Sequence, residues 1–218
     1  MLILAFDTAS PAVTVAVHDG IRVLAEHTVV DARRHGELLA PGIALVCADA
    51  GCSVSQLSKL AVGVGPGPFT GLRVGLMTAR AMFDALGIPV VGVCSLDILA
   101  AAVSSGAADL GSGEPYLVAT DARRREVYWA LYDATGRRTD GPFVGKATDI
   151  GWTGPAFGAG ALLYKESFAS AQPPELPSAG MLAAIVANES AEFLPPDPLY
   201  LRRPDAVEPV ARKAVSPQ

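Results

Sequence analysis

Three short apolar segments open the chain, each closed by turn residues. Residues 1–6, 13–17 and 21–29 are rich in β-branched and aliphatic side chains, as strands are. The Ala-Ser-Pro and His-Asp-Gly turns between them are short, which favours pairing of neighbours in sequence. The pattern predicts an antiparallel meander of three strands.

Longer periodic segments then alternate with short apolar runs. Residues 35–50, 71–86 and 95–103 have the length and spacing of helices, whereas 60–64 and 89–93 are the continuous apolar runs of buried strands. Strands that alternate with helices predict parallel pairing. The first hundred residues therefore predict the order βββαβαβα.

The opening pattern recurs in the second half. Asp7 ends the first apolar run before a turn and a second strand, and Asp121 ends the run 118–121 before another turn and the run 127–131. Two such units predict a duplicated domain. We therefore expect an α/β fold of the actin-like ATPase (RNase H-like) class, with two unequal βββαβα-type subdomains.

The two expected subdomains differ in size and regularity. Residues 1–103 form the first, the small and polar stretch 104–115 is a linker, and 116–218 form a smaller, partly irregular second subdomain. Within it, only 160–169 and 179–193 are helical candidates. The remainder includes stretches rich in Pro and Gly, at 141–160 and 173–180, which predict irregular structure.

Composition narrows the function classes. The chain has 218 residues, half of them hydrophobic, so it can bury a sizeable core. Its net charge of −5 argues against a broad basic surface that holds RNA directly. Cys47, Cys52 and Cys94 have neither metal-type nor redox-type spacing, which indicates inert core thiols in a reducing compartment. With no signal peptide or membrane-length apolar stretch, we expect a cytoplasmic protein without membrane contact.

The segment Gly65–Gly75 joins a predicted strand to a predicted helix. Its glycines allow positive φ and close backbone approach, its prolines fix φ, and Thr70 is placed to cap a helix that begins at Gly71. Backbone N–H groups at such a helix terminus can hold phosphate or carboxylate. The segment has neither the P-loop ending nor the dinucleotide spacing, and a purely structural turn is the alternative.

Several motifs together resemble the TsaB (YeaZ) family, which is needed for threonylcarbamoyladenosine modification of bacterial tRNA. They are Gly65–Gly75, the opening Phe6-Asp7-Thr8-Ala9, and His35 with Glu37. The resemblance is strongest over residues 1–100 and recurs at 121–128 and 200–202. Gly36 and Pro68 stand where the family commonly has serine, and neither change removes a catalytic atom.

The resemblance implies a non-catalytic subunit. The family scaffolds the catalytic subunit TsaD, on which the ATPase TsaE docks, and forms a homodimer in the absence of TsaD. It reaches tRNA only through this complex, which transfers a threonylcarbamoyl group to N6 of adenosine 37.

Two helices are the expected partner interface. Apolar residues occupy more than one face of the helix 35–50, and small residues recur at i, i+4 in the helix 71–86. Internal packing is the alternative for both patterns. In the family these helices form the pairing bundle. The expected interface residues are Leu38, Leu39, Ile43, Val46, Gly71, Leu72, Gly75, Leu76, Met77 and Ala79.

A nucleotide contact is also considered. Asp7 and Asp121 suit a hydrated Mg²⁺, although an Asp that ends a strand commonly caps its own turn. The residues expected for weak phosphate contact are Asp7, Thr8, Gly65, Gly67 and Asp121. We expect no required cofactor, and weak binding of ATP or ADP with Mg²⁺ stays open. A stand-alone small-molecule kinase or ATPase of this fold is the first rival.

We expect no catalytic residue and no metal site. TsaD carries a His-x-x-x-His metal pair on the helix that here begins at Ser95, and this helix contains no histidine. His18, His27 and His35 are the only histidines, and they are not at i, i+4 spacing. This weighs against a metallopeptidase, the second rival.

Overall fold

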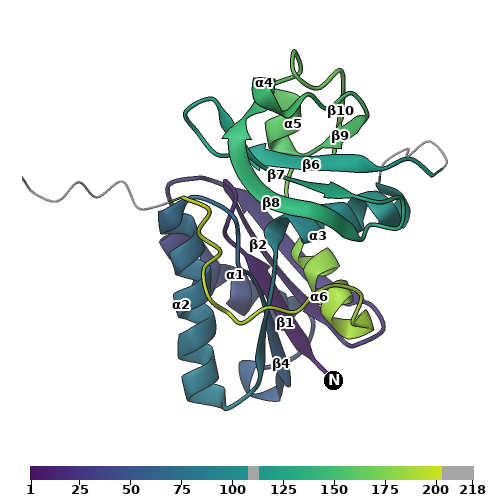
Figure 1. Cartoon of the computed structure of the whole chain (residues 1–218). Helices are drawn as coiled ribbons and strands as arrows, with labels where there is room; N and C mark the ends of the chain where they lie inside the picture. The colour runs from purple at the N-terminus through teal and green to yellow at the C-terminus, as the bar shows by residue number, and fades with distance from the viewer. Residues whose placement is uncertain (108–112, 203–218) are drawn as a thin grey trace, which may run out of the picture.

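The computed structural model describes residues 1–107 and 113–202, which form two lobes, each built on a five-stranded sheet (Figure 1). Of the expected linker 104–115, residues 104–107 belong to the helical segment η2 (Val103–Ala107), and residues 108–112 fall outside the described part of the chain.

The first sheet has the order β3-β2-β1-β4-β5, with β1–β3 antiparallel and β1, β4 and β5 parallel. This confirms the predicted meander and the parallel strands that follow it. The bounds are β1 (Ile3–Asp7), β2 (Ala12–His18), β3 (Val23–Val30), β4 (Lys59–Gly63) and β5 (Val90–Val93).

Helices cover both faces of this sheet, which explains why β1 and β2 are buried along their whole lengths. α1 (His35–Asp49) and α2 (Phe69–Leu86) pack on one face, against residues such as Phe6 and Val15, and η1 (Val54–Gln56) precedes β4. α6 (Ala179–Asn188) packs on the other face, against Ile3 and Ala5. The predicted helices 35–50 and 71–86 are thus present within two residues of their expected ends.

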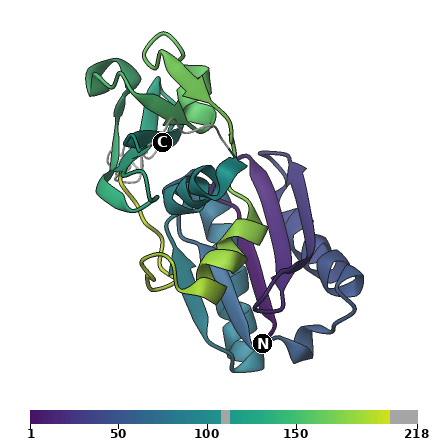
Figure 2. The same ribbon diagram turned by 90° about the vertical axis from the view of Figure 1, so that its right-hand side faces the viewer.

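α6 belongs by packing to the first lobe, although the sequence analysis assigns 116–218 to the second subdomain. Figure 2 shows this helix lying over the strands of the first sheet. It is buried there because Leu182, Ala183 and Val186 complete the core on that face. It ends at Asn188, five residues before the expected end, where Glu189 takes a left-handed φ of 51°.

The second sheet repeats the first. Its order is β10-β9-β6-β7-β8, so its first three strands form a meander and the next two join parallel beside β6, as β4 and β5 do beside β1. The duplicated fold of the actin-like class is confirmed. The bounds are β6 (Tyr116–Asp121), β7 (Glu126–Tyr132), β8 (Arg138–Lys146), β9 (Pro155–Phe157) and β10 (Ser170–Gln172).

The expectation of irregular structure over 141–160 is wrong for its first part, because β8 continues through Pro142 to Lys146. The connecting helices of this lobe are short: α4 (Ala147–Ile150) and α5 (Ala159–Leu163). The predicted helix 160–169 ends at Leu163, so only its first turn is present.

α3 (Ser95–Ala102), followed by η2 (Val103–Ala107), joins the two lobes. Its Ile98 packs in the core shared with α6, whereas Leu96 and Leu99 pack against Tyr116 and Tyr132 of the second sheet. The helix is therefore buried from both sides.

Residues 194–202, here called the C-terminal strap, cross both lobes. Leu194 exchanges two backbone hydrogen bonds with Gly92 of β5, and the Leu199 N–H donates to the Val64 carbonyl at 2.9 Å. At its end, Arg202 donates to the Ala122 carbonyl of the second lobe at 2.8 Å. The strap thus ties the turn after β6 to the first sheet.

Candidate functional site

The two predicted phosphate turns have the same local hydrogen bond. One carboxylate oxygen of Asp7 accepts from the Ala9 N–H at 2.8 Å, and one of Asp121 accepts from the Arg123 N–H at 2.8 Å. Each aspartate therefore caps the turn that follows its own strand, which was the structural alternative in the sequence analysis.

The second oxygen of Asp7 is also occupied. The Ser95 hydroxyl donates to it at 2.5 Å, and the same hydroxyl accepts from the Gly65 N–H at 3.2 Å. The carboxyl group is fully buried, and this burial raises the pKa of Asp7, while the hydrogen bonds from Ser95 and Ala9 oppose the rise. Asp7 is thus an internal tie between β1 and α3.

The glycine loop is closed in a similar way. The Thr8 hydroxyl donates to the Gly71 carbonyl at 2.8 Å and accepts from the Gly75 N–H at 3.1 Å. A Cβ on Gly67 would lie 2.1 Å from the Ala9 carbonyl oxygen, so the loop backbone packs directly on the first turn. The expectation that Thr70 caps this helix is wrong, because α2 begins at Phe69.

Little space separates the two turns. They border a cavity of about 40 Å³. A pocket for a small organic ligand usually has several hundred Å³, so this cavity alone is too small for a nucleotide. A second cavity of about 240 Å³ shares Ser10, Pro11, Pro68 and Arg123 with it. Asp7 and Thr8 are engaged in internal hydrogen bonds and line neither cavity. The smaller cavity is lined by Ala9, Ser10, Pro11, Pro68, Thr120, Asp121, Arg123, Ala159, Glu175 and Leu176.

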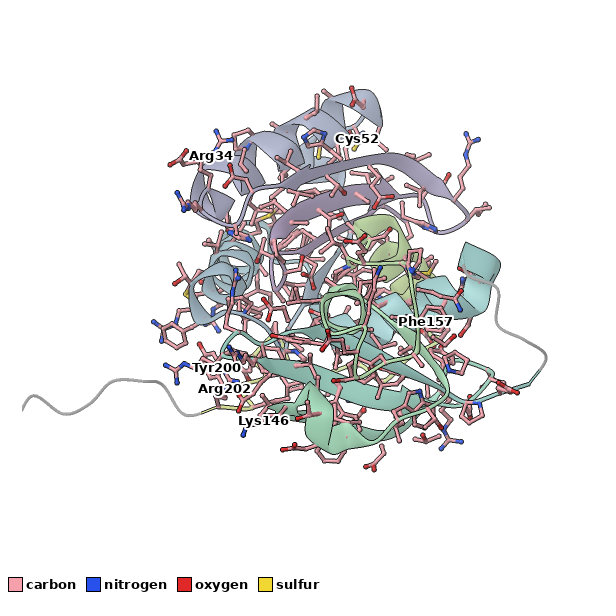
Figure 3. All side chains as sticks on the ribbon, turned by 90° about the horizontal axis from the view of Figure 1, so that it is seen from above. Arg34, Cys52, Lys146, Phe157, Tyr200 and Arg202 are labelled. Carbon is pink, nitrogen blue, oxygen red and sulfur yellow. The ribbon has the colours of Figure 1, made fainter. Side chains whose placement is uncertain are left out.

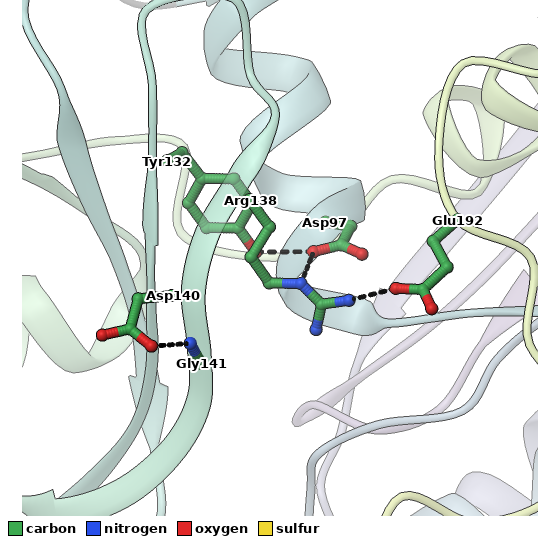
Figure 4. A network of polar contacts seen from close by, with 6 residues as sticks. All are labelled: Asp97, Tyr132, Arg138, Asp140, Gly141 and Glu192. Carbon is green, nitrogen blue, oxygen red and sulfur yellow. Dashed lines mark hydrogen bonds and ion pairs between the residues drawn. The ribbon is translucent and has the colours of Figure 1, made fainter.

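An ionic network crosses the interface between the lobes, and the sequence analysis missed it (Figure 4). Tyr132 of β7 donates from its hydroxyl to the Asp97 carboxylate of α3 at 2.7 Å. Arg138 of β8 lies 3.6 Å from the same carboxylate and donates to Glu192 at 2.7 Å. Burial raises the pKa of Asp97, and Arg138 opposes this rise. The sequence analysis compared α3 with the metal-binding helix of TsaD. In this chain, Asp97 of α3 instead links the two lobes.

Most of the predicted interface residues lie inside the chain. Leu39, Ile43 and Val46 of α1 are buried in the first core, with Leu72, Leu76 and Ala79 of α2. The predicted small-residue stripe packs inside the chain, chiefly against Thr8 in the turn after β1. A Cβ on Gly75 would lie 2.6 Å from the Thr8 hydroxyl, and one on Gly71 would lie 2.5 Å from the Thr8 carbonyl oxygen. We therefore correct these eight assignments to internal packing, since buried groups are not accessible to a partner.

The opposite face of α2 is exposed. Met77 is 63% exposed, and Phe69 and Phe83, which lie nearer the two ends of the helix, are 39% and 42% exposed. Arg73 lies over the Phe69 ring at 3.7 Å, and Arg80 lies near the Phe83 ring. Of the ten predicted interface residues, Met77 is exposed and Leu38 is half-buried. The sequence analysis missed Phe69 and Phe83. At about 100° per residue they lie roughly 80° and 120° around the helix from Met77, so periodicity alone does not group them with it.

Elements next to α2 also carry exposed or ring-stacked apolar side chains. α1 contacts α2 and exposes Leu45. At the other end, the Tyr200 ring of the strap stacks on Phe69, with centroids 5.2 Å apart. Figure 3 shows Tyr200 and Arg202 together at this end of the molecule. We call Leu38, Leu45, Phe69, Met77, Phe83 and Tyr200 the helical face.

Residues 1–107 and 113–202 contain no group of three or more His, Cys, Asp or Glu side chains placed to bind a metal ion. None of their helices has the length and apolar character needed to cross a bilayer.

The chain is similar in sequence and structure to several known proteins. The family model described as TsaD, tRNA N6-adenosine threonylcarbamoyltransferase, matches residues 22–150. An uncharacterized Mycobacterium tuberculosis protein is 48% identical over 94% of this chain and 93% of its own length. The Escherichia coli tRNA threonylcarbamoyladenosine biosynthesis protein TsaB is 35% identical over 68% of this chain and 61% of its own length. YeaZ from Pseudomonas aeruginosa has a TM-score of 0.78 and 29% identity over 92% of this chain and 99% of that chain.

Proposed function

Because the chain belongs to the TsaB (YeaZ) family, we propose that it serves tRNA threonylcarbamoyladenosine biosynthesis as a non-catalytic subunit that binds TsaD through the helical face. In this role it supports transfer of the threonylcarbamoyl group and contacts tRNA only through the complex. A cytoplasmic location follows from the role.

One observation carries the proposal: α2 exposes the large apolar side chain of Met77 while its small residues are used internally. At 63% exposure, Met77 contributes little to the core. Burying such side chains against a partner contributes roughly 25 cal/mol per Å² before the costs of association. The neighbouring Arg73 and Arg80 add charges at which a partner carboxylate can be oriented.

The direct test is Met77→Glu. A charge at an exposed site leaves the fold intact, but in an interface it must lose its water without gaining a partner. We expect circular dichroism to be unchanged and co-purification with TsaD of the same organism to be lost. tRNA modification by the reconstituted enzymes should fall with it.

The matched control is Leu163→Glu. Leu163 is 59% exposed and lies on α5 of the second lobe, so the chemical change and the exposure are nearly the same. This variant should bind TsaD normally. If Met77→Glu also binds normally, the helical face is not the TsaD interface.

The same face is proposed for the homodimer that forms without TsaD. Sedimentation of the isolated chain should therefore show Met77→Glu shifted toward monomer. We place TsaE on the assembled TsaB–TsaD pair, so both variants should recruit TsaE in proportion to the TsaD they retain.

We propose that no nucleotide cofactor is required, on the ground that the two turns are internally bonded around a 40 Å³ cavity. Steady ATP hydrolysis by the isolated chain, lost in Asp7→Asn, would favour the kinase or ATPase rival instead. Tight magnesium-dependent ATP binding in calorimetry would also contradict the proposal.

A further inference from the structure

The C-terminal end of α1 brings two cysteines together. The Cys52 N–H donates to the Cys47 carbonyl at 2.9 Å, and the Gly51 N–H donates to the Ala48 carbonyl at 3.0 Å. Gly51 has φ of 67°. These two bonds with a left-handed glycine define a Schellman motif, in which the side chains at the positions of Cys47 and Cys52 usually touch. The i, i+5 spacing thus becomes a contact in space.

Side-chain burial agrees with this contact. Cys47 is a member of the core cluster under α1, and Cys52 packs against the same cluster while remaining partly exposed (Figure 3). Cys52 is close enough to contribute to the raised pKa of the Cys47 thiol, after the larger effect of burial. Both are free, so one accessible and one enclosed thiol lie next to each other.

We propose that Cys47 and Cys52 form a reversible dithiol–disulfide site, oxidised by a low-molecular-weight disulfide such as oxidised glutathione. This revises the sequence interpretation of all three cysteines as inert, which holds only for Cys94. Cys94 is fully buried at the start of α3, in the cluster that α3 forms with Tyr116 and Tyr132 of the second sheet.

The reaction proceeds in two exchanges. The Cys52 thiolate attacks the reagent's disulfide, forms a mixed disulfide and releases one glutathione thiolate. The Cys47 thiolate then attacks the Cys52 sulfur, closes the Cys47–Cys52 bond and releases the second. The two thiol protons pass to the leaving thiolates, so the protein loses two electrons and the reagent gains them as two glutathione thiols.

The order of attack follows from the environment. Burial, with the neighbouring Cys52 as a smaller cause, raises the pKa of Cys47 to about 11, so this thiol is a poor first nucleophile. Once Cys52 is in the mixed disulfide it carries no charge, and its contribution to that rise disappears. The larger effect, burial of Cys47, remains. Because it keeps the thiolate fraction of Cys47 low, the second exchange should be the slower one and should quicken as pH rises.

The test treats the native, full-length chain with oxidised glutathione and follows its intact mass. We expect a transient glutathione adduct, then a product lighter by two hydrogens whose peptides contain the Cys47–Cys52 link. C47S should keep the adduct on Cys52, and C52S should stay unmodified. In both variants and in the wild type, Cys94 should remain a free thiol.

A wild type that keeps its glutathione adduct as C47S does, or that does not react at all, overturns the proposal. Dithiothreitol should restore the original mass. Circular dichroism of each variant before oxidation ensures that a result reflects the folded chain. This site lies outside the helical face, so the outcome is independent of TsaD binding.

Discussion

The two lobes share one sheet order but use it differently. In the first, the connections after the meander are α1 with 15 residues and α2 with 18, whereas α4 and α5 in the second have 4 and 5. α2 also exposes the apolar side chains Phe69, Met77 and Phe83. The shared strand order thus carries the fold of both lobes, whereas within the described residues the long helices, where we propose partner binding, occur only in the first lobe.

The corresponding turns differ as well. Asp7 is fully buried and bonded to α3, whereas Asp121 is partly exposed and pairs with Arg123 at 3.4 Å. Arg123, Arg124 and Arg125 all have φ near 60°, so the second turn is a run of left-handed residues without glycine. One turn is therefore fixed by tertiary contacts and the other mainly by its own backbone.

The largest expected effect comes from strand glycines. A Cβ on Gly63 of β4 would lie 1.7 Å from the Asp7 carboxylate, whereas one on Gly145 of β8 meets nothing within 4 Å. Gly63→Ala should lower the free energy of unfolding by about 4 kcal/mol or abolish folding, since it displaces a buried, bonded carboxylate. Gly145→Ala should change it by less than about 0.5 kcal/mol. Urea denaturation measures both, and equal effects would contradict the difference in packing around these two strand glycines.

A smaller effect is expected at the joint between the lobes. Arg138→Met removes the cation beside Asp97, which is only 8% exposed, and should cost about 3 kcal/mol because a buried carboxylate loses its partner. Glu192→Gln alters the exposed end of the same network and should cost less than about 0.5 kcal/mol. Thermal unfolding of both variants checks this. If Arg138→Met is as mild as Glu192→Gln, the lobes are held together by α3 and the strap alone.

The smallest expected effect is a change with pH. The folded-state pKa of Asp7 is raised above its ordinary value of 3.8, chiefly by burial, so the folded chain holds this proton more tightly than the unfolded chain. Protonation of Asp7 therefore favours the folded state, and the free energy of unfolding should rise as pH falls toward 3.8. Relative to Asp7→Asn, the wild type should gain stability on acidification.

Asp19→Asn is the control of opposite sign. The N–H groups of Arg22 and Ile21 lower the pKa of Asp19. Against this variant, the wild type should lose stability on acidification. Denaturant titrations of the three proteins at several pH values would reveal the two trends, and parallel curves would argue against the buried charge of Asp7.

Much of the first lobe was predictable because its pattern is local. The apolar runs of β1 to β5 and the periodicity of α1 and α2 specify those elements within a few residues. In the second lobe, β8 contains Gly141-Pro142, which is typical of a loop. Pro142 is tolerated because β8 is an edge strand whose pairing with β7 is irregular beside it.

The site was predictable only in outline. The small residues of α2 correctly indicated close backbone approach, but sequence does not say whether a strand of the same chain or a helix of another makes it. In the structure, the group that approaches Gly71 and Gly75 is Thr8, in the turn after β1 of the same chain. Likewise, Asp97 and Arg138 are 41 positions apart in sequence, and only the docking of the lobes makes them a pair.

The C-terminal strap has a further consequence for association. β5 is the last strand of its sheet, and such a strand offers free N–H and C=O groups to any extended chain that approaches. Leu194 occupies those groups at Gly92, and a Cβ there would lie 2.7 Å from the Pro195 carbonyl oxygen. The strap therefore covers the β5 edge at this point and hinders the addition of a strand from another chain there. A partner that approaches this side meets side chains of the strap and not unpaired backbone groups of Gly92.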